Sequence, residues 1–197
     1  MNVHSIFPTP FSEEQLDIDN AMLLSYAQQM RDREDSGRSG GWQSAWLDLN
    51  AKELSPLVKG VQDHFDRLSK ELYTFPDNIT IKLTNGWFNF NDPGEQQLNN
   101  NYYHLHGGFF TSAVYYIDVD TDTSGNLVLI PPHNFLDYAL PFQLVQQFNQ
   151  FTAQRFHVQP LNSKLVTFPS WINHYAEPNR SQHTRVCVAF NGVIDER

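Results

Sequence analysis

The sequence has one cysteine, few basic residues and no long apolar segment. Cys187 alone cannot form an internal disulfide, which suits a reducing cytoplasm. Lys and Arg number 13 against 22 Asp and Glu, which gives a net charge of −9. This balance argues against nucleic acid and anionic membranes as partners, because those surfaces are usually bound by clustered basic side chains.

Membrane and export signals are also lacking. No run approaches the ~20 apolar residues that are needed to span a bilayer. The first residues, MNVHSIFPTPF, have neither the basic start nor the apolar core of a signal peptide. We therefore expect a soluble, cytoplasmic protein with no membrane partner.

The residues that are present suit one globular domain. Hydrophobic residues make up 40% of the chain and aromatic residues 14%, which is enough for a substantial core. No linker-like stretch separates the helical part from the strands that follow it. We expect a single domain over residues 1–197, with mainly helical support in 1–74 and a β-strand core in 75–197.

The first third of the chain predicts two helices that lie against a sheet. Ser12 with Gln15 fits a capping box, and apolar residues then recur at helical spacing. Ser55 and Pro56 predict the start of the second helix, which has an apolar stripe along one face. His64 lies away from that stripe, so we expect it to be solvated.

From residue 75 onward the pattern changes to short strands and turns. Asn85-Gly86 predicts a hairpin between ITIKLT and WFNFN, and a helix is expected from Pro141 through FQLVQQFNQF. Further strands are expected at YYHLH, SAVYYIDVD, LVLI, RFHVQ, KLVTF and TRVCVAFN. Seven or eight short strands predict a mainly β fold, a sandwich or squat barrel with helices packed outside.

Three histidines form a candidate metal site. His104 and His106 are two residues apart, so in a strand they project from the same face with Cα atoms roughly 6.5–7 Å apart. Imidazoles at that separation can chelate one ion, but two ligands seldom suffice. His174 is the best third ligand, because it comes just past a strand after Pro169 and can point into the barrel mouth.

Arg185 indicates an anionic ligand. In the expected strand TRVCVAFN it shares a face with Cys187 and Ala189, which predicts a buried guanidinium. No acidic residue lies nearby in the sequence. A ligand carboxylate would match the planar fork of the guanidinium.

The order of these motifs resembles that of iron(II)- and 2-oxoglutarate-dependent oxygenases. It runs from His-x-His through SAVYYIDVD, GNLVLIPP, LVTFPSWINH and EPNR to RVCVAFN, and IFPTPF extends the likeness over nearly the whole chain. The chain is most similar to a little-characterised branch of bacteria and tailed phages, which implies host-cell cytoplasm if it is phage-encoded. The family fold is a double-stranded β-helix, a jelly-roll or cupin-like core buttressed by helices.

The resemblance assigns roles to individual residues. His104 matches the first iron ligand and His174 the distal one, while Arg185 matches the residue that binds the distal carboxylate of 2-oxoglutarate. Tyr116 matches a position where some members place a hydroxyl on that carboxylate, and Ser112 shares its strand face and is expected to line the pocket. Beyond the metal centre, no catalytic side chain is implied.

The sequence departs from the family motif at one ligand. The usual Asp or Glu is replaced by His106, which implies a three-histidine centre. In a second register His106 is the first ligand and Gly108 stands at the carboxylate position. Some relatives with such a gap bind halide there and halogenate their substrates.

The resemblance implies Fe(II), 2-oxoglutarate, O₂ and a primary substrate as reactants. The expected reaction is hydroxylation of a protein side chain, peptide or small molecule, with release of succinate and CO₂. Two alternatives stay open: a cupin-like three-histidine metalloenzyme that does not use 2-oxoglutarate, and a non-catalytic jelly-roll module that holds a structural metal. Arg185 favours the oxygenase, because only that reaction needs a co-substrate anchor.

Overall fold

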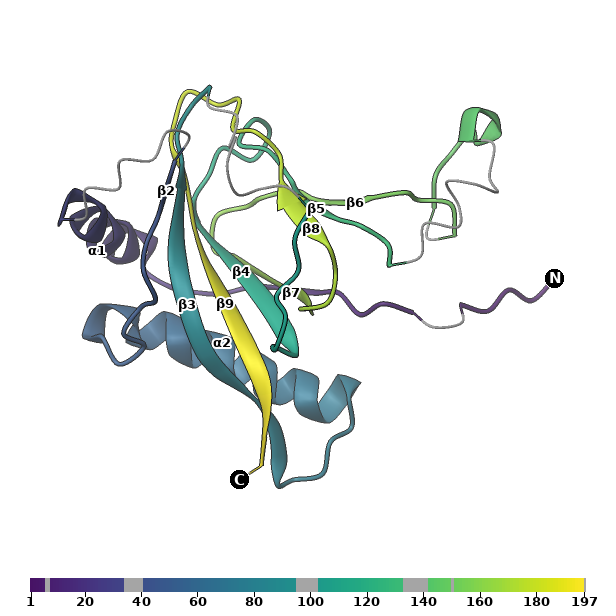
Figure 1. The fold of residues 1–197 in the computed structure, drawn as a ribbon, viewed down its shortest axis with the longest axis horizontal. Coiled ribbons are helices and arrows are strands. Elements are labelled where there is room, and N and C mark those ends of the chain that lie inside the picture. The colour runs from purple at the N-terminus through teal and green to yellow at the C-terminus, as the bar shows by residue number, and fades with distance from the viewer. Residues whose placement is uncertain (6–7, 34–40, 95–102, 133–141, 150, 197) are drawn as a thin grey trace.

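The fold consists of two antiparallel sheets with two helices against the larger one (Figure 1). The computed structural model describes residues 1–5, 8–33, 41–94, 103–132, 142–149 and 151–196. The helices are α1 (Asn20–Arg33), η1 (Lys52–Leu54), α2 (Ser55–Arg67), η2 (Leu68–Leu72) and η3 (Phe142–Leu144). The strands are β1 (Ser12–Gln15), β2 (Trp42–Gln43), β3 (Ile79–Asn91), β4 (Thr111–Asp118), β5 (Leu127–Leu129), β6 (Phe156–Val158), β7 (Lys164–Pro169), β8 (His174–Ala176) and β9 (Arg185–Glu196).

The large sheet has the strand order β1-β7-β4-β9-β3-β2, and the small sheet has the order β6-β5-β8. This mainly β, jelly-roll arrangement confirms the expected fold class. No helix among the described residues is long and apolar enough to cross a membrane.

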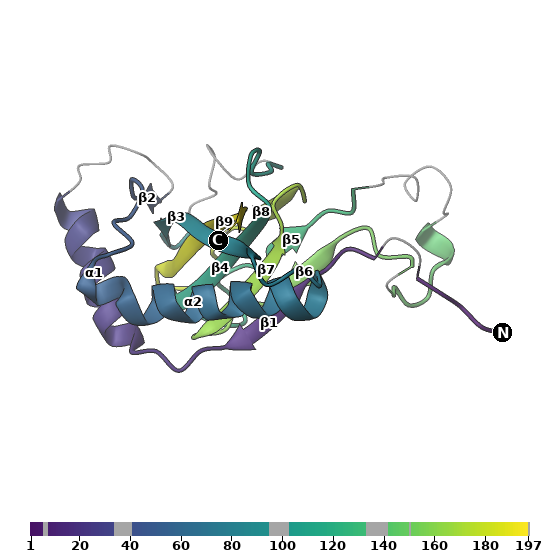
Figure 2. The ribbon, with the colours of Figure 1, turned by 90° about the horizontal axis from the view of Figure 1, so that it is seen from below.

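Helices α1 and α2 cover the outer face of the large sheet, as expected from their apolar stripes (Figure 2). Leu57, Val61 and Phe65 of α2 are fully buried there. From the sheet, Val188 and Phe190 of β9 join the same core. Because side chains alternate along a strand, the residues between them face the opposite way, into the space between the sheets.

That inner face carries a second, smaller apolar cluster. Tyr116 of β4, Phe168 of β7 and Cys187 of β9 pack there against Leu127 and Leu129 of β5. The sequence separated these two faces correctly for β4 and β9. Arg185 and Ser112 lie on the inner face as well, which brings polar groups into the interior of the barrel.

The expected capping box at Ser12 is wrong. Residues Ser12–Gln15 form β1, which pairs with β7. Helix α1 begins later, where the side chain of Asp19 accepts hydrogen bonds from the backbone N–H groups of Ala21 and Met22. Asp19 is therefore the residue that caps the helix.

The expectation that His64 is solvated is also wrong. The residue is only 6% exposed, since β1 covers this part of α2. Its Nδ1 lies 2.6 Å from Oε2 of Glu14, and its Nε2 lies 3.0 Å from Oγ of Ser12. Ser12, which suggested a helix start, thus serves together with Glu14 to satisfy a buried histidine.

The hairpin expected at Asn85-Gly86 does not form. Both residues lie inside β3, where the pairing with β9 shifts register between Leu83 and Asn85, as at a β-bulge. A Cβ atom on Gly86 would lie 2.5 Å from Cδ1 of Phe190. The glycine therefore allows close approach of β9, a role that sequence alone does not distinguish from a turn.

The helix expected after Pro141 is largely missing. Among the described residues of that segment, only Phe142–Leu144 form a short 3-10 helix, and 145–149 are irregular. Pro141 and residue 150 lie outside the described residues.

Candidate metal and co-substrate site

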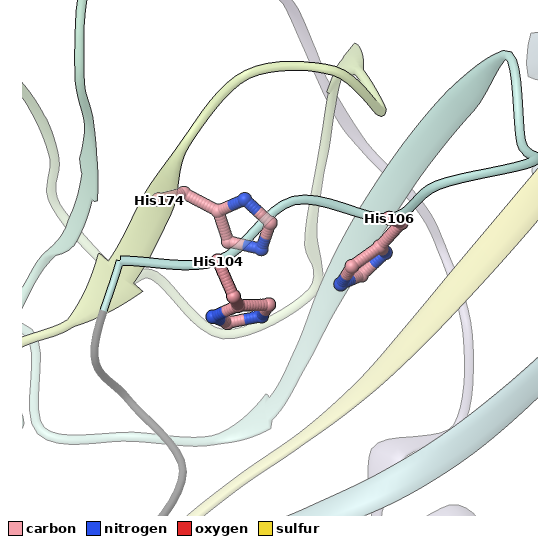
Figure 3. Close-up of side chains that lie close together, drawn as sticks. All are labelled: His104, His106 and His174. Carbon is pink, nitrogen blue, oxygen red and sulfur yellow. The ribbon is translucent and has the colours of Figure 1, made fainter.

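Three histidine side chains meet at one end of the barrel (Figure 3). His104 forms an isolated β-bridge with His174, the first residue of β8. The backbone N–H of His106 donates to the carbonyl of Ser170 at 2.9 Å. One ring nitrogen from each histidine lies within 4.8 Å of those of the other two, close enough to share an ion.

The backbone around these histidines differs from the sequence expectation. In the described part of YYHLH only His104 forms a bridge, and the rest is irregular. His174 belongs to a separate short strand, β8, that the sequence did not predict. The side chains still meet, because the bridge between His104 and His174 pairs these two residues at the β8 edge of the small sheet.

The ring of His174 is held by the backbone. Its Nδ1 donates to the carbonyl oxygen of Ile172 at 2.9 Å, which leaves Nε2 with its lone pair. Burial lowers the pKa of His174 to about 3. The imidazole is thus neutral over the ordinary pH range, as a metal ligand must be.

The ring of His106 is held by side chains. Its Nδ1 lies 2.7 Å from Oδ1 of Asn191 and 3.0 Å from Oγ of Ser112. The Ser112 hydroxyl also donates to that Oδ1 at 2.9 Å and lies 2.8 Å from Oγ of Ser170. Because an amide oxygen only accepts, Nδ1 carries the proton and Nε2 is available to a metal. Burial also lowers the pKa of His106.

This donor set fits iron(II). Three neutral imidazoles suit Fe(II), Zn, Cu or Ni, and three protein ligands leave coordination positions open for a co-substrate. The proximity of His104, His106 and His174 favours the three-histidine register. In the register that uses Gly108, His104 would not be a metal ligand. The structure, however, places a ring nitrogen of His104 in the same cluster as those of His106 and His174.

The inner face of β9 holds a buried cation. Arg185 is 2% exposed, and its Nε and Nη1 make no hydrogen bond to any described residue. Its guanidinium carbon lies 5.5 Å from the ring centroid of Tyr116, whose buried hydroxyl also has no partner among the described residues. Burial raises the pKa of Tyr116 to about 12, so its hydroxyl remains a donor.

A buried guanidinium without an anion is costly, since its lost hydration is not replaced. A ligand carboxylate placed between Arg185 and Tyr116 would supply the missing acceptors. The distal carboxylate of 2-oxoglutarate fits this requirement, as the sequence suggested for both residues.

The sequence of this region matches a known family model. Residues 85–191 match the family described as "Putative 2OG-Fe(II) oxygenase". The chain belongs to the 2OG-Fe(II) oxygenases. The cofactors of this family are Fe(II) and 2-oxoglutarate (2OG), and the match includes the three histidines and Arg185. A comparison with curated proteins found no match.

Solved structures of similar fold include several oxygenases. A prolyl hydroxylase from Trichoplax adhaerens, in complex with a hypoxia inducible factor peptide fragment, has 14% identity, a TM-score of 0.62, and coverage of 93% of this chain and 83% of its own. A viral collagen prolyl hydroxylase from Paramecium bursaria Chlorella virus-1, in a 2OG complex, has 10% identity and a TM-score of 0.60. The match covers 95% of this chain and 96% of the viral one. The epimerase SnoN from nogalamycin biosynthesis has 14% identity and a TM-score of 0.65. The match covers 96% of this chain and 81% of SnoN. At such low identity the likeness shows the fold alone.

Two residues beside the histidines were missed by the sequence reasoning. Asn191 and Ser170 are 2% and 0% exposed and hydrogen-bond around His106 and Ser112. A polar residue at the inward position of an apolar strand is the signal that marks Asn191. Ser112, expected to line the co-substrate pocket, has its hydroxyl on the His106 side of that space.

Proposed function

We propose that residues 1–197 form one domain, with support in 1–74 and a core in 75–197, that hydroxylates a substrate with 2-oxoglutarate and O₂. Succinate and CO₂ are the co-products. The observation that carries this proposal is the buried Arg185, whose Nε and Nη1 have no partner among the described residues, in the barrel that also holds the histidine cluster. A metal site alone would not need such a cation, whereas a co-substrate with a second carboxylate does.

In this proposal the protein supplies geometry. His104, His106 and His174 hold the iron, and their orientation is fixed by the bridge at His104, by Asn191 and by Ile172. When bound, iron(II) supplies the capacity to chelate a 2-oxo acid and to activate oxygen.

In this proposal, Arg185 and Tyr116 bind the distal carboxylate of the co-substrate. Together they fix it through charge-assisted hydrogen bonds in an interior that excludes water. Because both side chains are buried, a keto acid without a second carboxylate would leave these donors unsatisfied and bind less well.

The surface near the histidines supports an uncharged substrate group. Leu105, between two of the ligands, is 48% exposed, and Trp171 is 50% exposed. The ring centroid of Trp87 lies 5.5 Å from that of His106. Aromatic and aliphatic groups of this kind suit a peptide, a protein side chain or a small molecule more than a polyanion. The peptide in the Trichoplax structure supports the peptide among these.

The test is turnover of 2-oxoglutarate to succinate by iron(II)-loaded protein, followed by NMR with and without candidate peptides and small molecules. We expect slow succinate release alone and faster release with a true substrate. His174→Ala should abolish both, because it removes a ligand without touching Arg185. Iron-loaded protein that leaves 2-oxoglutarate unchanged under all these conditions would favour the cupin-like alternative.

A further inference from the structure

Asn91, the last residue of β3, lies beside Arg185. The two residues are register partners in the antiparallel pairing of β3 with β9, so their side chains share the inner face. Asn91 is 6% exposed, and its amide nitrogen Nδ2 has no hydrogen-bond partner among the described residues. Its backbone carbonyl accepts a hydrogen bond from Asn179 at 2.8 Å, which fixes the chain at this point.

Tyr116 lies on the other side of Arg185. It is on β4, where its register partner is Cys187, two residues along β9 from Arg185. The central strand β9 thus carries the guanidinium, and the two strands that flank it carry an amide and a phenol. Each of the three side chains is at least nine-tenths buried and has an unpartnered polar atom.

All of these unpartnered groups can donate a hydrogen bond: Nδ2 of Asn91, Nε and Nη1 of Arg185, and the hydroxyl of Tyr116. The three nitrogen donors cannot satisfy one another, and a buried donor without an acceptor is destabilising. The other buried polar atoms without a partner among the described residues are single ones elsewhere, Nε1 of Trp42 on β2 and Oδ1 of Asn85 on β3. Several such donors occur together only where Asn91 meets Arg185 and Tyr116, within the described part of the chain.

We propose that Asn91 is a further binding residue for the distal carboxylate of 2-oxoglutarate, to which its Nδ2 donates. A carboxylate has about four acceptor positions, enough for donors from three strands. This inference rests on the proposed function, since it names one more contact of the same co-substrate. It also explains why an amide is buried next to a buried cation, where a carboxylate would neutralise Arg185 within the protein and exclude the ligand.

The test is calorimetric titration of 2-oxoglutarate into Ni(II)-loaded wild type, Asn91→Ala, Asn91→Asp and Arg185→Gln. Asn91→Ala should bind about tenfold more weakly through the loss of one charge-assisted hydrogen bond. Asn91→Asp should bind more weakly still, because its carboxylate repels the ligand and pairs with Arg185. Asn78→Asp adds the same charge at an exposed position before β3 and should bind like the wild type.

Two further measurements separate a contact from a structural effect. The probe 2-oxobutyrate has no distal carboxylate, so its competition at the metal should be the same in the wild type and in both Asn91 variants. In metal-free protein, Asn91→Asp should raise the Tm by at least about 2 °C, since Arg185 gains a partner.

The outcomes distinguish the two proposals. If Arg185→Gln loses 2-oxoglutarate while both Asn91 variants bind it like the wild type, Asn91 is not a ligand residue and the proposed function stands. If 2-oxobutyrate binding falls as much as that of 2-oxoglutarate, the substitution disturbs the whole site and the inference is overturned. If the metal-loaded wild type binds no 2-oxoglutarate, the proposed function itself is wrong.

Discussion

A histidine that binds metal needs one nitrogen for the ion and a partner for the other. His174 has such a partner in the carbonyl of Ile172, and His106 has one in the amide oxygen of Asn191. In each case the partner accepts, which keeps the proton on Nδ1 and the lone pair on Nε2. The orientation of His106 therefore depends on a residue 85 positions away in the sequence.

This dependence predicts the effect of changing Asn191. Asn191→Leu removes the acceptor and should weaken metal binding about 10- to 100-fold. Asn191→Asp keeps an oxygen acceptor and should retain wild-type affinity. Cobalt(II) titration followed by visible absorption measures both affinity and ligand geometry. Equal affinity and spectra for wild type and Asn191→Leu would show that Asn191 does not position His106.

The sequence predicted the residues of the proposed site better than their support. His104, His106, His174 and Arg185 stood out because histidine and arginine are uncommon at inward positions of apolar strands. Asn191 did not, because its partner His106 is adjacent only once β4 and β9 have paired. Such contacts depend on tertiary register, which local patterns do not encode.

At the scale of elements, apolar periodicity predicted the faces of helices and strands well, whereas polar residues and glycine predicted caps and turns poorly. The alternation in β4 and β9 correctly separated the two faces of each strand, and the stripe of α2 correctly indicated the buried face of the helix. Ser12 and Gly86 were interpreted as local signals, a cap and a turn. Ser12 instead hydrogen-bonds to His64 and Gly86 accommodates Phe190, both of them long-range contacts.

The attachment of α1 to the end of β3 gives a pH-dependent prediction. Arg31 donates to both carboxylate oxygens of Asp92, at 3.0 and 2.6 Å, and Thr184 donates to one of them at 2.9 Å. The hydrogen bonds from Arg31 are the main reason that the pKa of Asp92 lies below its usual value. This contribution to stability is present above the unfolded pKa near 3.9 and is lost as the pH falls through the folded pKa.

Asp92→Asn should therefore lower the free energy of unfolding at pH 7 by about 1–2 kcal/mol. The difference from the wild type should shrink as the pH falls from 7 to 3, because the Asp92 carboxyl of the unfolded wild-type chain takes up a proton more readily than that of the folded protein. Urea unfolding at both pH values measures this. Asp195→Asn, which removes an exposed pair with Lys82, should cost no more than about 0.5 kcal/mol and serves as the control. A cost for Asp92→Asn that does not change with pH would contradict the assignment.

At the scale of the whole molecule, the two faces of the large sheet have separate tasks. The outer face is buried by α1 and α2 in an apolar core, which supplies most of the stability (Figure 2). That support allows the inner face to hold polar atoms that have no partner within the described part of the chain, including Nε and Nη1 of Arg185 and the hydroxyl of Tyr116. Such groups reduce stability, and a ligand that fills their hydrogen bonds would restore it.

The proposed function requires that one interior holds both iron and 2-oxoglutarate. The most direct measurement is the visible absorption of anaerobic iron(II) protein during addition of 2-oxoglutarate. We expect the metal-to-ligand charge-transfer band of a chelated 2-oxo acid, retained in His106→Asp, where a carboxylate replaces an imidazole ligand. Iron-loaded wild-type protein that shows no band at saturating 2-oxoglutarate would contradict it.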